Sequence, residues 1–275
     1  PHQLEDRIEQ LFHEKSSTSY GAWTRLFEET IVSLRFKVDG RELTIVEVQH
    51  LLQDNDGDKR RAAALALGET LKTRLPVFAL IKEISDRWRG FTDIADSRHL
   101  SNRVEPELVS ALVAAVEEAY PRLSHRYYAW KAKQFGVDAL EYWDRNAPIP
   151  GGDTSLYTWR EARDLILDAY AGFAPPMADI ARRFFENNWI DAPARPGMGK
   201  SRDVMTLAHE LGHGVHQFLS APQGMLMGGA PLTLAETASV FGEMLTFQKM
   251  LSRSASPRER RLLLAAKVSD MLNTV

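Results

Sequence analysis

The stretch that most constrains this chain runs from Asp203 to Leu219 and reads DVMTLAHELGHGVHQFL. It contains the pattern H-E-x-x-H, with histidines at positions 209 and 213. Residues four apart on a helix lie one above the other, so both imidazoles can reach one zinc ion at roughly 2.0–2.1 Å. Glu210 then lies beside the metal, where its carboxylate can take a proton from a zinc-bound water. The stretch therefore predicts a hydrolytic zinc site.

The same stretch has the features of a helix. Ser201 and Asp203 are expected as N-caps, and no proline interrupts the chain until Pro222. Apolar residues recur at helical spacing, namely Val204, Leu207, Leu211, Val215, Phe218 and Leu219. The alternative interpretation is a helix whose two histidines are only packed or solvated, without a metal ion.

A catalytic zinc site needs a third protein ligand and leaves its fourth position to water. The long metzincin pattern would place glycine at 216 and histidine at 219, but the chain has His216 and Leu219. A second helix, expected from Pro231 to Leu245, offers glutamates instead. Thr233 is predicted to cap this helix through a Thr-x-x-Glu arrangement with Glu236.

Two glutamates of that second helix, Glu236 and Glu243, lie two turns apart on one face. Two carboxylates opposite the metal helix indicate one metal ligand and one hydrogen-bond partner of a ligating imidazole. They are separated by about 10 Å along the helix axis, so one ion cannot take both. Periodicity does not choose between them, although Glu236 is in the first turn, next to the connector from the metal helix. A solvated surface glutamate is the ordinary alternative, but the neighbouring residues Ala235, Ala238 and Val240 are apolar.

The sequence HELGHGVH followed by AETASVFGEML resembles the oligoendopeptidase F and thimet oligopeptidase family of zinc metallopeptidases. Within this family, the resemblance is nearer to the oligoendopeptidase F branch. Four upstream stretches resemble the same branch: AWTRLFEETIVSLRF, ISDRWRGFTDIADSRHLSNRV, YPRLSHRYYAWKAKQFG and EYWDRNAP. The resemblance therefore covers nearly the whole chain. It implies a mainly α, multi-helical, zincin-like peptidase body with a deep substrate channel and a minor β component.

The resemblance also implies roles for individual residues. By position, one zinc ion per chain would be held by three residues, His209, His213 and Glu236. Glu210 would be the general base, and Ser239 completes the family's E-x-x-S pattern that begins at the glutamate ligand. Glu243 is then expected to hydrogen-bond a ligating imidazole and fix its orientation. His216 matches the last histidine of the family's HExxHxxH, which does not bind zinc there.

Two domains are expected along the chain. Residues 1–55 are predicted to be the end of an N-terminal helical lobe, with a β-hairpin that turns at Asp39 and Gly40. Residues 56–275 are predicted to be part of the peptidase catalytic domain. The resemblance implies that this domain is incomplete at residues 200/201 and at the C-terminus, where groups that stabilise the oxyanion and bind substrate are expected.

Short patterns predict how several helices begin. The segments Thr44–Glu47 and Thr158–Glu161 each have the capping-box pattern Thr-x-x-Glu. The segment Asp54–Asp58 has alternating aspartates like a calcium loop, but Leu65 stands where a bidentate glutamate would be needed. We therefore expect a turn and a helix cap there.

Composition limits the partners of this chain. A net charge of −3 gives no reason to expect nucleic acid or an anionic membrane as partner. No apolar run approaches the ~20 residues of a membrane span. The chain has no cysteine, which excludes thiolate metal sites and agrees with a reducing, cytoplasmic location. The oligomeric state is not indicated.

Together these patterns predict a zinc-dependent endopeptidase that hydrolyses short, unstructured oligopeptides, with Glu210 activating the zinc-bound water. One alternative is a helical peptide-binding module that keeps the zinc helix but is catalytically silent, because the sequence shows no oxyanion donor. Another is a zinc exopeptidase with the same site, which would not cleave N-terminally blocked peptides.

Overall fold

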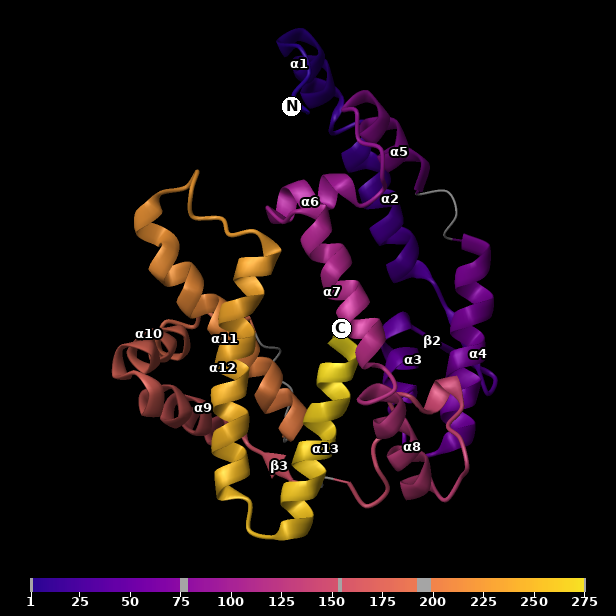
Figure 1. The fold of residues 1–275 in the computed structure, drawn as a ribbon, viewed down its shortest axis with the longest axis vertical. Helices are drawn as coiled ribbons and strands as arrows, with labels where there is room; N and C mark the ends of the chain where they lie inside the picture. Colours follow the sequence, from indigo (N-terminus) through magenta and orange to yellow (C-terminus); the bar gives the residue numbers. More distant parts are fainter. Residues whose placement is uncertain (1, 75–78, 153–154, 192–198, 275) are drawn as a thin grey trace. The chain divides into compact units, whose positions relative to one another are not determined.

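The computed structural model describes residues 2–74, 79–152, 155–191 and 199–274 (Figure 1). These residues are mainly helical, and their strands form two short two-stranded sheets. The predicted mainly α class with a minor β component is thereby confirmed. The chain divides into two compact units, Pro1–Pro150 and Gly151–Val275. The predicted domain boundary at residues 55/56 stays a prediction, and the predicted gap at 200/201 borders residues 192–198, which lie outside the described residues.

The first unit contains eight described helices and one hairpin. Its elements are α1 (Asp6–Lys15), α2 (Tyr20–Ser33), β1 (Phe36–Val38), β2 (Arg41–Leu43), α3 (Ile45–Leu51), α4 (Gly57–Arg74), α5 (Ala79–Trp88), α6 (Asp96–Asn102), α7 (Pro106–Ala119), α8 (Ser124–Phe135) and the 3-10 helix η2 (Tyr142–Asp144). The two strands pair antiparallel, with Phe36 opposite Leu43. Asp39 and Gly40 both have a positive φ, as a two-residue type I′ turn requires, so the predicted hairpin is confirmed.

The core of this unit forms around the hairpin. Phe36 and Val38 of β1 and Val48 of α3 are buried against the alanine face of α4. The predicted cap of α3 is present, because the hydroxyl of Thr44 accepts from the backbone N–H of Glu47 at 3.4 Å. At the start of α4, successive aspartate side chains in the segment 54–58 accept from backbone N–H groups two residues on. This is the predicted turn.

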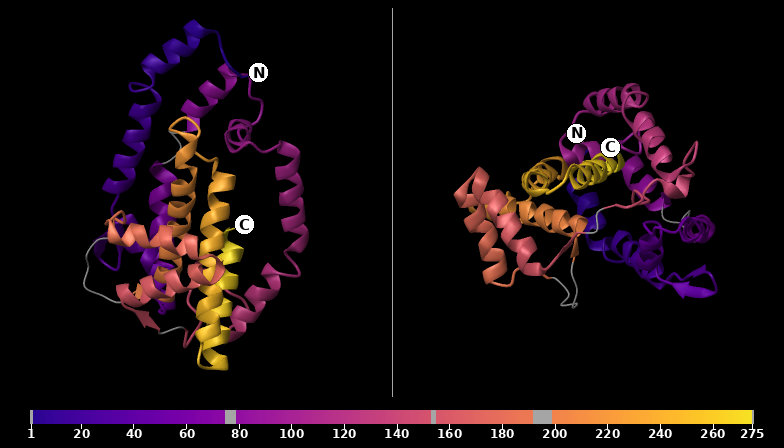
Figure 2. Two further views of the ribbon diagram at one scale, coloured as in Figure 1. Left: turned by 90° about the vertical axis from the view of Figure 1, so that its left-hand side faces the viewer. Right: turned by 90° about the horizontal axis from the view of Figure 1, so that it is seen from below.

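The second unit is built from five helices and one small sheet among its described residues. Its elements are β3 (Leu156–Tyr157), α9 (Trp159–Phe173), α10 (Pro175–Glu186), β4 (Gly199–Lys200), α11 (Ser201–Ser220), the 3-10 helix η3 (Ala221–Gln223), α12 (Leu232–Arg253) and α13 (Pro257–Thr274). The helices α11 and α12 pack along each other, and α9 and α10 contact α11 (Figure 2). The predicted cap of α9 is present, with the hydroxyl of Thr158 accepting from the N–H of Glu161 at 3.2 Å.

The predicted N-caps of two helices in this unit are wrong. The helix α11 begins at Ser201, and its N-cap is Lys200 rather than Ser201 or Asp203. Lys200 is the last residue of β4 and pairs with Leu156, so its backbone is extended and the helix starts directly after the strand. Asp203 instead lies in the first turn, where its carboxylate accepts from the N–H of Lys200 at 2.6 Å.

The helix α12 begins at Leu232, one residue after the expected Pro231 and before the predicted cap Thr233. Its N-cap is Pro231, whose extended backbone precedes the helix. Thr233 therefore lies inside the first turn and does not cap it. Glu236 is thus free of the predicted capping role, and its carboxylate points towards α11 instead.

Candidate metal centre

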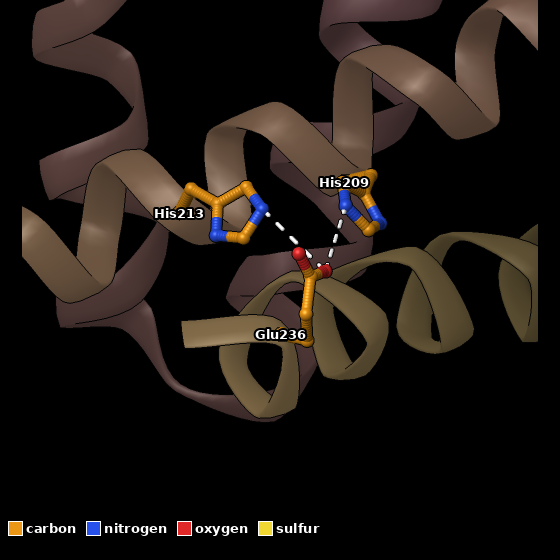
Figure 3. A group of neighbouring side chains, drawn as sticks. All are labelled: His209, His213 and Glu236. Carbon is orange, nitrogen blue, oxygen red and sulfur yellow. Dashed lines mark ion pairs between the residues drawn. The ribbon is translucent and has the colours of Figure 1, made fainter. Parts of the chain in front are cut away.

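Three side chains predicted as metal ligands come together between α11 and α12 (Figure 3). One carboxylate oxygen of Glu236, Oε2, lies 3.2 Å from Nε2 of His209 and 3.7 Å from Nε2 of His213. One potential ligand atom from each of the three residues lies within 4.8 Å of the others. All three side chains are only partly buried, so the group is open to solvent on one side.

The chemistry and spacing of this group fit a zinc ion. Two imidazoles and one carboxylate are ligands that zinc accepts, and three protein ligands leave one position for water or substrate. In a tetrahedral site with bonds of roughly 2.0–2.1 Å, neighbouring ligand atoms lie about 3.3 Å apart. The two nitrogen–oxygen distances here, 3.2 and 3.7 Å, are close to that value.

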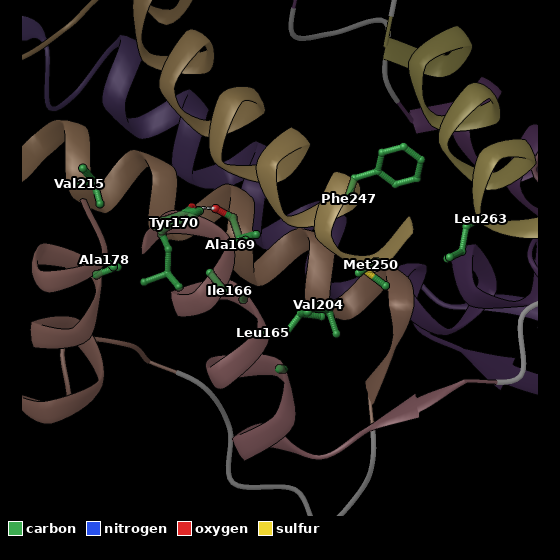
Figure 4. Packing of buried hydrophobic residues seen from close by; sticks show 14 residues of the cluster. Leu165, Ile166, Ala169, Tyr170, Ala178, Val204, Val215, Phe247, Met250 and Leu263 are labelled. Atoms are coloured by element: carbon green, nitrogen blue, oxygen red, sulfur yellow. Dashed lines mark hydrogen bonds between the residues drawn. The ribbon is translucent and has the colours of Figure 1, made fainter. Parts of the chain in front are cut away.

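The helix α11, which carries both histidines, is held in place by packing on its inner side (Figure 4). The residues buried there recur at helical spacing and are Val204, Ala208, Leu211, Gly212 and Val215. Ile166 and Tyr170 of α9 are fully buried in the same cluster. The hydroxyl of Tyr170 donates to the carbonyl of Ala208 at 2.6 Å, and burial raises the pKa of this hydroxyl. The carbonyl lies next to His209 in the chain, so the contact fixes the backbone at the site.

Two glycines allow α11 and α12 to approach closely. A Cβ atom on Gly212 would lie 2.7 Å from the carbonyl oxygen of Ala238 and from Cα of Ser239. On α12, a Cβ atom on Gly242 would lie 3.2 Å from the carbonyl oxygen of Ala208 on α11 and 2.2 Å from the hydroxyl of Tyr170 on α9. Ser239, fully buried at this crossing, donates to Oε2 of Glu236 at 3.0 Å. The crossing therefore brings the carboxylate to the imidazoles and holds it there.

The substitution Gly212→Ala is expected to destabilise the protein by about 1–3 kcal/mol, because the new methyl group meets backbone atoms that cannot turn aside. Zinc affinity should fall as well, since moving α12 moves Glu236. Gly172→Ala in α9 is the matched control, because a Cβ atom there has no neighbour within 4 Å. Urea unfolding and zinc titration of both variants measure these effects. Parent-like stability and zinc affinity in Gly212→Ala would contradict this account of the crossing.

The second glutamate of α12 lies on the other side of the same imidazole. Oε2 of Glu243 is 3.3 Å from Nδ1 of His209, so the expected imidazole partner is within reach. The other oxygen of this carboxylate accepts from the ammonium of Lys267 on α13. Burial opposes the charge of Lys267, but hydrogen bonds to Glu243 and Asp270 outweigh it and raise the pKa of the lysine.

Lys267 is not among the residues that the sequence predicted near the site. A signal was nevertheless present, because Lys267 follows Leu263 by four residues and so shares its face of the helix. A lysine on the buried face of a helix needs a partner of opposite charge, and the structure supplies Glu243.

The remaining predicted site residues lie beside the group. Glu210 is exposed, and within the described part of the chain it makes no hydrogen bond or ion pair. On the helix it lies about 60° around the axis from His213, at the edge of the metal-facing side. His216 is half-buried and, within the described residues, stands outside the three-residue group.

A pocket of ≈ 670 Å³ adjoins the metal group. Phe184, Phe218, Leu232 and Ala235 supply apolar surface, while His213, His216 and Glu236 also line the pocket. The connector between α11 and α12 borders it through Gly228. The pocket therefore places apolar surface next to the potential metal ligands.

Comparisons with known proteins agree with the sequence resemblance. Residues 183–275 match the model of peptidase family M3, and residues 1–36 match the model named Oligopeptidase F. An oligoendopeptidase F homolog of Lactococcus lactis is 26% identical, over 85% of this chain and 43% of the relative. The group B oligopeptidase PepB of Streptococcus agalactiae is 24% identical, over 100% of this chain and 51% of the relative.

Solved structures share the fold. Oligoendopeptidase F from Enterococcus faecium matches with a TM-score of 0.63 and 19% identity, over 100% of this chain and 48% of that structure. PZ peptidase A, solved with an inhibitor, matches with a TM-score of 0.72 and 18% identity, over 98% of this chain and 53% of that structure. The chain thus spans about half the length of these proteins. Among the described helices, none is both long and apolar enough to cross a membrane.

Proposed function

We propose that this chain, which matches the models of peptidase family M3 over residues 183–275 and of Oligopeptidase F over residues 1–36, forms the metal-binding part of a zinc-dependent endopeptidase. The observation that carries the proposal is the approach of Glu236 to both imidazoles of the H-E-x-x-H helix. One zinc ion per chain would be held by His209, His213 and Glu236.

In this proposal the zinc site and Glu210 have different roles in peptide hydrolysis. When bound, zinc supplies a Lewis acid that acidifies a water molecule and polarises the peptide carbonyl. Glu210 accepts a proton from the attacking water and returns it to the leaving amine. Its exposed carboxylate suits this role, because a side chain that makes no ion pair or hydrogen bond within the described residues can turn towards substrate.

We propose short, unstructured oligopeptides as substrates. An extended peptide could place one apolar side chain in the pocket beside Glu236 and His213 while its carbonyl faces the metal position. The deep channel implied by the family resemblance would exclude folded proteins. The cysteine-free sequence favours the reducing cytoplasm as the compartment.

Zinc content and peptide cleavage test the proposal together. The purified protein is expected to contain one zinc ion per chain by elemental analysis, and to lose cleavage of an N-terminally blocked, internally quenched peptide when a chelator is added. Adding zinc back should restore cleavage. Protein that binds zinc and the peptide without cleaving it would support the silent peptide-binding module. Cleavage of only the unblocked peptide would support an exopeptidase.

A further inference from the structure

Lys267 of α13 is a buried cation that contacts α12, one of the two helices that form the candidate metal centre. It is 9% exposed, although lysine side chains ordinarily remain in solvent. Its ammonium contacts two carboxylates, Glu243 on α12 and Asp270 one turn further along its own helix, the latter at 3.1 Å. Asp270 is largely exposed, whereas the side chain of Glu243 is 12% exposed. The buried contact is therefore the one with Glu243.

The packing of α13 against α12 brings this lysine to Glu243. The two helices lie side by side, joined by a short turn after Arg253 (Figures 1 and 2). Leu263, one turn before Lys267, is buried in the same apolar cluster that supports the metal helix. Leu263 thus positions the face of α13 that carries the lysine.

Both oxygens of Glu243 have a partner, and the two partners are different residues. Oε1 accepts from Lys267, while Oε2 lies 3.3 Å from Nδ1 of His209. A carboxylate with only one partner can rotate about its last bond, whereas one held at both oxygens cannot do so without breaking a contact. A fixed acceptor at Nδ1 selects the tautomer of His209 that carries its proton there. The other ring nitrogen, Nε2, is then left with a free lone pair towards Glu236 and the metal position.

We propose that Lys267 is a positioning residue for the metal site, acting through Glu243 on the imidazole of His209. The inference rests on the proposed metal-binding role of His209. It makes the docking of α13 a determinant of metal affinity, although α13 supplies no ligand among the described residues.

If Lys267 acted only through its charge, its removal would change zinc affinity in the opposite direction. An ammonium repels a divalent cation, so removing its charge without any change in orientation would tighten zinc binding. This repulsion is weakened by distance and by the two carboxylates that already neutralise the lysine. Loss of an indirect partner of a metal ligand typically weakens metal affinity by 10–100-fold. The direction of the change in zinc affinity therefore distinguishes a positioning role of Lys267 from a direct effect of its charge.

Lys267→Met keeps the aliphatic stem and removes the ammonium. We expect the zinc dissociation constant, measured by competition with a chromophoric chelator, to rise about tenfold. Lys267→Arg should remain within about threefold of the parent, because a guanidinium can still donate to Glu243. Asp270→Asn is the matched control, since it removes the exposed partner and leaves the Glu243 contact, and its zinc affinity should be parent-like. Circular dichroism and unfolding of the metal-free proteins report whether each variant is folded.

A double substitution completes the test. In a Glu243→Gln background, Lys267→Met should change zinc affinity by less than about twofold, because the residue through which the lysine acts is altered. Unchanged or tighter zinc binding by folded Lys267→Met would overturn the inference, as would an undiminished loss in the double variant. If Lys267→Met does not fold, a tenfold loss in folded Lys267→Arg would also overturn it. Parent protein that binds no zinc would instead refute the proposed metal site itself.

Discussion

Glu210→Gln is expected to keep the fold and the metal but lose nearly all peptide hydrolysis. The amide has the shape of the carboxylate but cannot accept a proton from the attacking water. Loss of a general base typically lowers turnover by ~10²–10⁴-fold. Glu210 is exposed and makes no hydrogen bond or ion pair within the described residues, so its replacement removes no contact that stabilises the helix. Turnover measured at saturating blocked peptide, with zinc content measured alongside, gives the result.

Glu186→Gln at the end of α10 is the matched control for this variant. The residue is likewise an exposed helical glutamate without a hydrogen bond or ion pair in the described part of the chain. It should hydrolyse peptide at the parent rate. Turnover of Glu210→Gln within a few-fold of this control would remove Glu210 from the mechanism. Loss of zinc from Glu210→Gln would show that the residue acts in metal binding rather than in proton transfer.

The features that sequence predicted well depend on neighbours in the chain. The hairpin at Asp39 and Gly40 follows from a two-residue turn that needs positive φ at both positions. The caps at Thr44 and Thr158 follow from side chains that reach backbone groups three residues away. The helix α11 was predictable because its buried residues and its histidines recur with the helical period.

The features that sequence missed depend on contacts between distant segments. The start of α11 is set by the pairing of Lys200 with Leu156 of β3. The residues around Lys200 do not indicate this partner, because β3 lies more than 40 residues earlier in the chain. The contact of Lys267 with Glu243 depends on how α13 folds back along α12. The approach of Gly212 to the backbone of α12 is likewise visible only once the two helices are packed.

The structure also separates Glu236 from Glu243, which periodicity alone left equivalent. Glu236 directs one oxygen at Nε2 of both histidines, whereas Glu243 meets only the far nitrogen of His209. Glu236→Ala is therefore expected to abolish tight zinc binding, because it removes one of the three proposed ligands. Glu243→Ala should weaken zinc affinity by only about 10–100-fold, because it loosens the orientation of a ligand that remains. Zinc dissociation constants of the two variants measure the difference.

Stability of the metal-free protein should rank the same two variants in the opposite order. The side chain of Glu236 is 43% exposed and faces solvent on one side, so its loss should leave unfolding nearly unchanged. Loss of Glu243 leaves Lys267 buried with only the exposed Asp270 as partner, which should lower stability by about 1–3 kcal/mol. Because the two measurements move in opposite directions, general damage to the fold cannot imitate the expected pattern. Weaker zinc binding in Glu243→Ala than in Glu236→Ala would reverse the assignment of the third ligand.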